Sequence, residues 1–167
     1  MKNLAVISMV LLMATACAPI KMFFHSPNYT DTEGMRQGKW IYTSVQDPER
    51  LESKGRFKND RPGGKWKYYD SEENLLRKEK YKYKDGETRI KTTFYYPDRR
   101  VEKEGWAQVE YTETQTHYYW VGRWNYYNEA GELIAVKNFT KGIGEPEVLW
   151  ENDSNANSNK KRQQGFE

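Results

Sequence analysis

Few side chains in this sequence are of types that carry out chemistry, and they lie far apart in the chain. The only two histidines are His25, which precedes Ser26, and His117. A serine nucleophile needs a base held rigidly against it and a third group that orients that base. Pro27 follows Ser26 in a segment without apolar periodicity, so we expect no such rigidity there. Two imidazoles also fall short of a metal site that needs three, and the sequence predicts neither a metal nor another cofactor.

Acidic side chains recur in pairs, such as Glu102 with Glu104 and Asp70 with Glu72. Glycosidase chemistry requires two carboxyl groups that face each other across a cleft at about 5–10 Å. Charged residues make up 31% of this chain, so pairs of this kind arise by chance. Pairs along a strand edge are commonly solvated, and Lys103 lies between Glu102 and Glu104. The sequence therefore predicts a protein that is not an enzyme.

The composition restricts both the partners and the core. A chain of 167 residues fits one domain. Its 27 Lys and Arg against 24 Asp and Glu give a formal net charge of +3. That balance is too even for a general nucleic-acid or membrane-surface binder, so we expect no nucleic acid as a partner. Leu, Ile, Val and Phe reach only about 17%, whereas aromatic residues reach 15%. The aromatic residues must therefore supply most of the core, which favours strands over helices.

The first residues have the pattern of an export signal. Lys2 precedes the apolar run LAVISMVLLMATA at residues 4–16. This run is shorter than the roughly 20 residues that a membrane-spanning helix needs. A short basic start, an apolar run and a small-residue end are typical of a secretory signal peptide. The sequence therefore predicts a signal peptide at residues 1–16.

The end of that run, Ala14-Thr15-Ala16-Cys17, resembles the lipobox of bacterial lipoproteins, in which small residues precede an invariant cysteine. Cys17 is the only cysteine of the chain. The resemblance implies a diacylglycerol on the Cys17 thiol and an acyl chain such as palmitate on its amine, which together make release from the membrane slow. Ala18 in place of aspartate implies the outer rather than the inner membrane of the envelope. The alternatives are an ordinary signal peptide with an incidental cysteine and a retained signal anchor.

The rest of the chain divides into three parts by composition. Residues 17–35 show no period and contain two prolines, so we expect a lipid-anchored tether. Residues 145–167 are mostly polar, which predicts a disordered tail. Residues 36–144 lie between them and form the predicted domain.

A repeated unit runs through that domain. Gly38-Lys39-Trp40-Ile41-Tyr42 recurs at 64–69 and 122–127, and residues 92–96 form a degenerate copy without Gly and Trp. A polar turn, an aliphatic residue and, in most units, a second aromatic residue follow each copy. Aromatic residues at alternate positions share one face of a strand, and a period of this length indicates stacked supersecondary units. Each unit therefore predicts a strand, a turn and a second strand.

This unit resembles the MORN-repeat variant of bacterial envelope proteins, over about residues 36–144. Two departures are Thr43 in place of a second tyrosine and an insertion between Val109 and His117. The resemblance implies an antiparallel β-hairpin array, and it implies interaction rather than catalysis. We therefore expect an all-β fold, an antiparallel meander of about four stacked β-hairpin repeats in one domain.

The repeated aromatic positions predict a core and two candidate binding surfaces. A second aromatic set should point to the face opposite the core, as an exposed ladder for sugar rings or a protein partner. The alternative is that this set covers its face against loops and lysine stems. A further surface is expected beside the insertion, because insertions in repeat arrays often lie on the binding face. The predicted core is Trp40, Trp66, Tyr68, Tyr95, Trp124 and Tyr126, the ladder is Tyr69, Tyr96 and Tyr127, and the further surface is Tyr118, Tyr119 and Trp120.

These patterns together predict a protein anchored to a membrane of the bacterial envelope by an N-terminal lipid. Its β-repeat domain is expected to bind another envelope protein, as a scaffold without catalytic activity. The alternative function is glycan or cell-wall binding through the exposed aromatic ladder.

Overall fold

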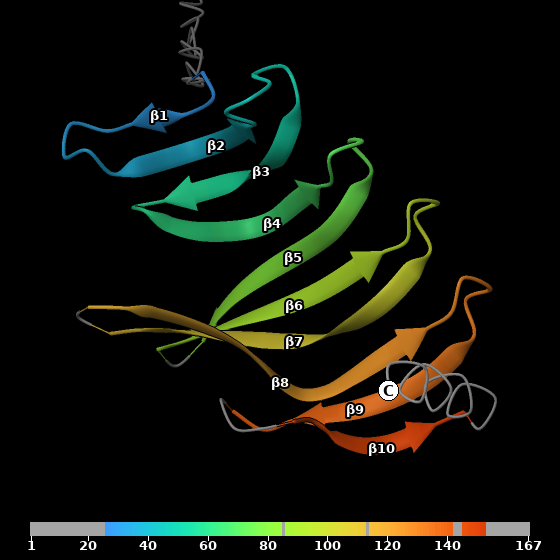
Figure 1. Ribbon diagram of the computed structural model, residues 1–167. Coiled ribbons are helices and arrows are strands. Elements are labelled where there is room, and N and C mark those ends of the chain that lie inside the picture. Colours follow the sequence, from blue (N-terminus) through green and yellow to red (C-terminus); the bar gives the residue numbers. More distant parts are fainter. Residues whose placement is uncertain (1–25, 85, 113, 142–144, 153–167) are drawn as a thin grey trace, which may run out of the picture.

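The computed structural model describes residues 26–84, 86–112, 114–141 and 145–152. These residues form ten strands in one sheet, in which each strand pairs with the next along the chain (Figure 1). The all-β meander predicted from the repeats is therefore confirmed. The signal peptide, Cys17 and His25 lie outside the described residues. The strands are β1 (Tyr29–Thr30), β2 (Arg36–Thr43), β3 (Leu51–Lys58), β4 (Arg61–Tyr69), β5 (Leu75–Lys84), β6 (Glu87–Tyr95), β7 (Val101–Tyr111), β8 (Thr116–Tyr127), β9 (Leu133–Phe139) and β10 (Glu147–Glu151).

The four predicted repeats are the hairpins β2–β3, β4–β5, β6–β7 and β8–β9. Their turns all lie along one edge of the sheet, on the right in Figure 1. The turns at 70–74, 96–100 and 128–132 share one hydrogen-bond pattern, in which the first and last residues bond through the backbone. Their fourth residues, Glu73, Arg99 and Gly131, all have positive φ. The three turns are therefore structurally equivalent, and they fix which residues of the hairpins correspond.

The sheet extends beyond the predicted repeats at both ends. Strand β1 lies in the segment expected to be a tether and pairs with β2. Strand β10 pairs with β9, so the disorder expected for 145–167 is wrong for Glu147–Glu151. Val148, Leu149 and Trp150 suit a strand, and the free edge of β9 gives it hydrogen-bond partners. Residues 153–167 lie outside the described residues.

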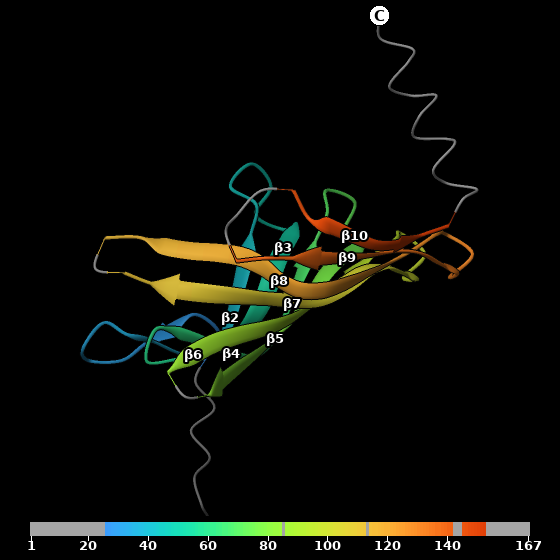
Figure 2. The ribbon, with the colours of Figure 1, turned by 90° about the horizontal axis from the view of Figure 1, so that it is seen from below.

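The insertion near Val109 lengthens a hairpin instead of forming a loop. Strands β7 and β8 remain paired as far as Tyr111 and Thr116. As a result, this hairpin projects past the neighbouring strands (Figure 2).

One face of the sheet, called the aromatic face below, carries the core. Trp66 and Trp124 are 3% and 0% exposed, and Ile90 and Ala107 are fully buried in a cluster against which Tyr81 and Trp120 pack. Five of the predicted core residues share this face: Trp40, Trp66, Tyr68, Trp124 and Tyr126.

The sixth predicted core residue, Tyr95, lies on the opposite face. Arg77 pairs with Tyr68 on one side and with Phe94 on the other, so Phe94 continues the aromatic row. The Phe94 ring lies 5.9 Å from Trp120 and 6.3 Å from Trp124. Side chains alternate along a strand, which directs Tyr95 away from the core. The third repeat lacks the glycine and tryptophan that mark this register, so its Tyr-Tyr pair aligns one residue too late.

Glycines on neighbouring strands let two tryptophans lie flat against the sheet. A Cβ atom at Gly55 would lie 2.1 Å from the Trp66 ring, and one at Gly105 would lie 2.3 Å from the Trp124 ring. The Trp124 indole Nε1 donates to the backbone oxygen of Trp106 at 3.0 Å. These close approaches require residues without a side chain.

The sheet curls toward its aromatic face. Tyr111 of β7 lines the same hollow, of about 360 Å³, as Phe57 of β3 and Trp66 of β4. The opposite face is therefore the outer face of the curl. The two faces carry different chemistry, described next.

Candidate functional site

The predicted surface Tyr118, Tyr119 and Trp120 does not form one patch, because alternation divides it between the two faces of β8. Trp120 packs in the core, where its ring stacks on Trp124 at a centroid distance of 3.9 Å. Tyr119 lies on the outer face with the Lys141 ammonium 5.4 Å from its ring centroid. Tyr118 lies on the aromatic face near the hairpin end and is 42% exposed.

The predicted ladder of Tyr69, Tyr96 and Tyr127 is displaced by one residue in its middle member. Tyr69 and Tyr127 end their strands at equivalent positions, whereas Tyr96 begins a turn and donates its hydroxyl to the Tyr127 backbone oxygen at 2.8 Å. The equivalent residue of the third repeat is Tyr95, and all four tyrosines are half-buried. Lysine ammonium groups lie 5.3 Å from the Tyr69 ring centroid and 4.7 Å from that of Tyr95. Lysines therefore lie over Tyr69 of the predicted ladder and over Tyr95, the residue that takes the place of Tyr96.

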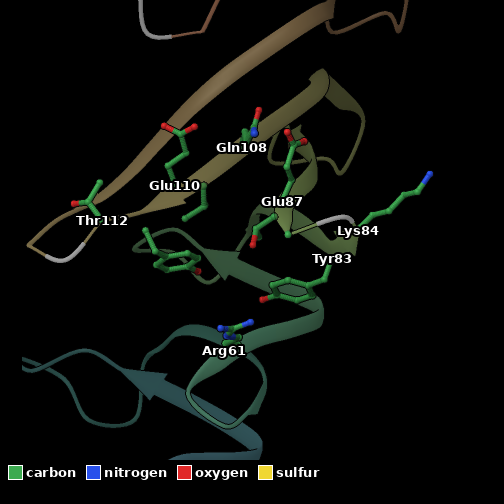
Figure 3. Close-up of a pocket in the computed structure, with 11 residues that line it drawn as sticks. Arg61, Tyr83, Lys84, Glu87, Gln108, Glu110 and Thr112 are labelled. Carbon is green, nitrogen blue, oxygen red and sulfur yellow. The ribbon is translucent and has the colours of Figure 1, made fainter.

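A hollow of about 700 Å³ lies where the β5–β6 and β7–β8 hairpins approach the start of β4 (Figure 3). Arg61 and Tyr83 lie on one side, and Gln108, Glu110 and Thr112 face them from β7 and the start of its turn. The lining of this hollow contains both basic residues, Arg61 and Lys84, and acidic residues, Glu87 and Glu110.

Ion pairing and exposure define the chemistry of this hollow. The Lys141 ammonium pairs with the Glu110 carboxylate and lowers its pKa, so Glu110 stays ionised at neutral pH. Tyr83 and Tyr111 also line the hollow and are 45% and 55% exposed. The sequence analysis missed both tyrosines. The signal that could have found Tyr83 is its place two residues after Tyr81, which puts both on one face of a strand, shortly before Gly86 in the sequence.

A buried carboxylate forms the main polar cluster of the aromatic face. Glu79 accepts hydrogen bonds on Oε2 from the hydroxyls of Tyr68 and Tyr81, at 2.9 and 3.0 Å. Its Oε1 lies 3.3 Å from the Arg77 Nε and 3.4 Å from the Tyr118 hydroxyl. Burial, followed by the charge of Glu79, raises the pKa values of Tyr68 and Tyr81 above those of ordinary tyrosines.

Three tyrosine hydroxyls donate hydrogen bonds to Glu79, and the Arg77 guanidinium adds an ion pair. The cluster therefore joins strands β4, β5 and β8 as a structural network. The sequence analysis missed Glu79, because a glutamate between two lysines resembles any solvated strand residue.

The carboxylate pairs considered as catalytic candidates are engaged in local contacts. Glu104 lies 3.0 Å from the Lys91 ammonium, and Glu102 lies 2.9 Å from that of Lys103. Asp70 accepts from the backbone N–H groups of two residues in its own turn. His117 is exposed on β8. Among the described residues, no three acidic, histidine or cysteine side chains are placed to hold a metal ion.

Comparisons with known protein families, with curated proteins and with solved structures find no match to this chain. In the part of the chain that the structure describes, no helix is long and apolar enough to cross a membrane.

Proposed function

We propose that this chain is a lipid-anchored protein of the bacterial envelope, attached to the outer membrane through Cys17. Its β-hairpin sheet, similar in sequence pattern to a MORN-repeat variant, serves as a non-catalytic module that binds another envelope protein. The export-signal pattern and the lipobox-like residues support the anchor. A group of exposed tyrosines at the edge of the sheet where the β5–β6 and β7–β8 turns lie supports the binding function.

These tip tyrosines are Tyr83, Tyr111 and Tyr118. Register places Tyr83 and Tyr118 in one row across the aromatic face, and Tyr111 lies near the end of the same hairpin as Tyr118. All three residues are more than 40% exposed. The hydroxyls of Tyr83 and Tyr118 donate to Pro62 and Glu79, so it is mainly the ring surfaces that remain open to a partner. Tyrosine is among the residues that dominate binding energy at protein interfaces. The projecting β7–β8 hairpin carries Tyr111 and Tyr118, and Tyr83 lies at the end of the neighbouring strand β5.

Site-directed photo-crosslinking in intact cells tests the binding function. A photoreactive phenylalanine analogue replaces Tyr111 in one variant and Val45 in the control variant, since Val45 is 91% exposed in a turn on the opposite edge. We expect one reproducible protein adduct from position 111 and none from position 45. With the purified partner, Tyr83→Ala with Tyr111→Ala should weaken binding at least tenfold. The same adducts from both positions, or unchanged affinity of the double variant, would contradict the proposal.

The anchor is tested separately by the mass of the protein extracted from membranes. We expect loss of residues 1–16 and added mass from acyl chains on Cys17, and we expect Cys17→Ser to release the protein from membranes. A free thiol at Cys17, or an unprocessed leader, would contradict the anchor without bearing on the tip tyrosines.

The alternative of glycan binding through the tyrosine ladder has less support, because lysine ammonium groups lie over Tyr69 and Tyr95.

A further inference from the structure

The outer face of strands β2–β6 is densely basic, and it is called the lysine face below. Buried residues such as Trp66, Glu79 and Ile90 fix the orientation of these strands, so their alternate residues point outward. Two glutamates, Glu52 and Glu87, lie near the ends of the same strands. The basic residues of the face include Lys39, Lys54, Arg56, Lys58, Lys65, Lys67, Lys78, Lys80, Lys82, Arg89 and Lys91.

Strand register places these cations directly opposite one another. Lys67 pairs with Lys54 on one side and with Lys78 on the other, and Lys80 lies between Lys65 and Lys91. The same holds for Lys39 with Arg56 and for Lys82 with Arg89. Like charges directly opposite each other destabilise a sheet. Among the described residues of these pairs, Lys91 has an acidic partner, Glu104 at 3.0 Å.

The lysine face is also hollowed. One depression of about 140 Å³ is lined by Lys39, Lys54 and Arg56, and another of about 380 Å³ by Lys78, Lys80 and Lys91. Lys65 and Lys67 line both depressions, so the two adjoin in one line across the strands, called the groove below. Five strands at their usual separation give this groove a length of about 19 Å.

We infer that the lysine face binds a linear anionic polysaccharide, whose repeated carboxylate, phosphate or sulfate groups would lie along this groove. A chain of anions would relieve the repulsion among the opposed lysines. A groove that crosses a twisted sheet (Figure 2) fits a flexible chain, whereas a flat bilayer could contact only part of it at once. Lysine heads on flexible stems act as adjustable point charges, which suits anions at irregular spacing. The choice of a polysaccharide over a nucleic acid rests on the proposed location in the envelope.

Binding to defined polymers tests this inference. The full-length chain, purified in an uncharged detergent, is titrated with fluorescently labelled alginate, a polyuronate, and with neutral dextran of similar length. We expect saturable binding to alginate that weakens as salt is raised, and no binding to dextran. The double variant Lys65→Gln with Lys67→Gln should lower affinity about tenfold or more and reduce the salt dependence.

A matched control removes two charges elsewhere. Arg99→Gln with Arg100→Gln alters the turn at 96–100, on the edge of the sheet, and should leave alginate binding unchanged. The unfolding midpoint of each variant shows that it is folded. Equal loss in both double variants, or affinity for dextran equal to that for alginate, would overturn the inference.

Two further probes separate this inference from its competitors and from the proposed function. Tighter binding to a single-stranded oligonucleotide, or to vesicles containing anionic lipid, than to alginate would overturn the assignment to a polysaccharide. Tyr111→Ala should not affect alginate binding, because Tyr111 lies outside the groove. Failure to find a protein partner at the tip tyrosines would therefore leave the result on the lysine face intact, and the reverse also holds.

Discussion

Substitution of Gly105 by alanine tests the packing of the aromatic face. The added Cβ atom would lie 2.3–2.5 Å from three atoms of the Trp124 ring, whereas carbon atoms normally approach to about 3.5–4.0 Å. Trp124 is fully buried and its ring stacks on Trp120, so it has no free space to enter. Displacing it would also break the hydrogen bond from its Nε1 to the Trp106 backbone oxygen.

The expected loss follows from these contacts. Overpacking of a core costs about 1–3 kcal/mol, and loss of one hydrogen bond costs about 1 kcal/mol. Alanine also lowers the conformational entropy of the unfolded chain, which offsets this loss by about 0.4–1 kcal/mol. We therefore expect Gly105→Ala to lower the free energy of unfolding by about 1–3.5 kcal/mol.

The assay is urea unfolding followed by tryptophan fluorescence, with Gly63→Ala as the matched control. Gly63 has ordinary φ, and a Cβ atom there would meet nothing within 4 Å. This control should be neutral or slightly stabilising. Circular dichroism of the stacked indoles gives a second reading, which should change in Gly105→Ala alone. If both variants unfold at the same urea concentration, Trp124 does not lie over Gly105 and the packing described here is wrong.

Two further predictions concern the lysine face and the buried cluster. Lys67→Glu places a negative charge between the two lysines that flank position 67. It should raise the free energy of unfolding by about 0.5–1 kcal/mol at low salt, and Lys67→Gln should give a smaller increase. A loss of stability in Lys67→Glu would contradict the repulsion among the lysines. For Tyr68 and Tyr81 the folded-state pKa lies above the value of 10.0 for a free tyrosine. These tyrosines therefore ionise first in the unfolded chain as the pH rises. Their contribution to stability is complete below about pH 10 and declines as the pH rises further. Urea unfolding between about pH 8 and about pH 11 should show this decline, and Tyr68→Phe with Tyr81→Phe, which retains every lysine, should make it shallower; identical slopes would refute the role of these hydroxyls.

Much of the fold could be predicted from the sequence because its hairpins are local. A glycine, alternating aromatic residues, a polar turn and an aliphatic residue recur within each repeat, and neighbouring strands pair in chain order. The third repeat shows the limit of this reasoning. Its three consecutive aromatic residues, Phe94, Tyr95 and Tyr96, permit two alignments. The distance to Val101 would have selected the right one, because Leu75 and Leu133 follow Tyr69 and Tyr127 by the same six residues that separate Tyr95 from Val101.

The candidate surfaces were harder to predict. Whether a tyrosine is exposed depends on what packs over it from other strands, and this is not a local property. Trp120 is covered by Trp124, while Tyr118 on the same strand remains exposed at the hairpin end. Glu79 is buried only because tyrosines from β4, β5 and β8 surround it.

The sequence by itself determined the composition, the repeat and the near-even charge balance, and from these an all-β hairpin array with an aromatic core. Only the tertiary structure decided how the charges are distributed. Strand alternation and register bring the lysines together on one face of the sheet. The net charge of the whole chain does not show this arrangement. Many of the balancing carboxylates lie along the edge formed by the hairpin turns, namely Asp47, Glu49, Asp70, Glu72, Glu73, Asp98, Glu129 and Glu132. Asp47, Asp70 and Asp98 accept hydrogen bonds from backbone N–H groups of their own turns. A net charge of +3 therefore conceals a strongly basic surface, because the net charge contains no information about strand register.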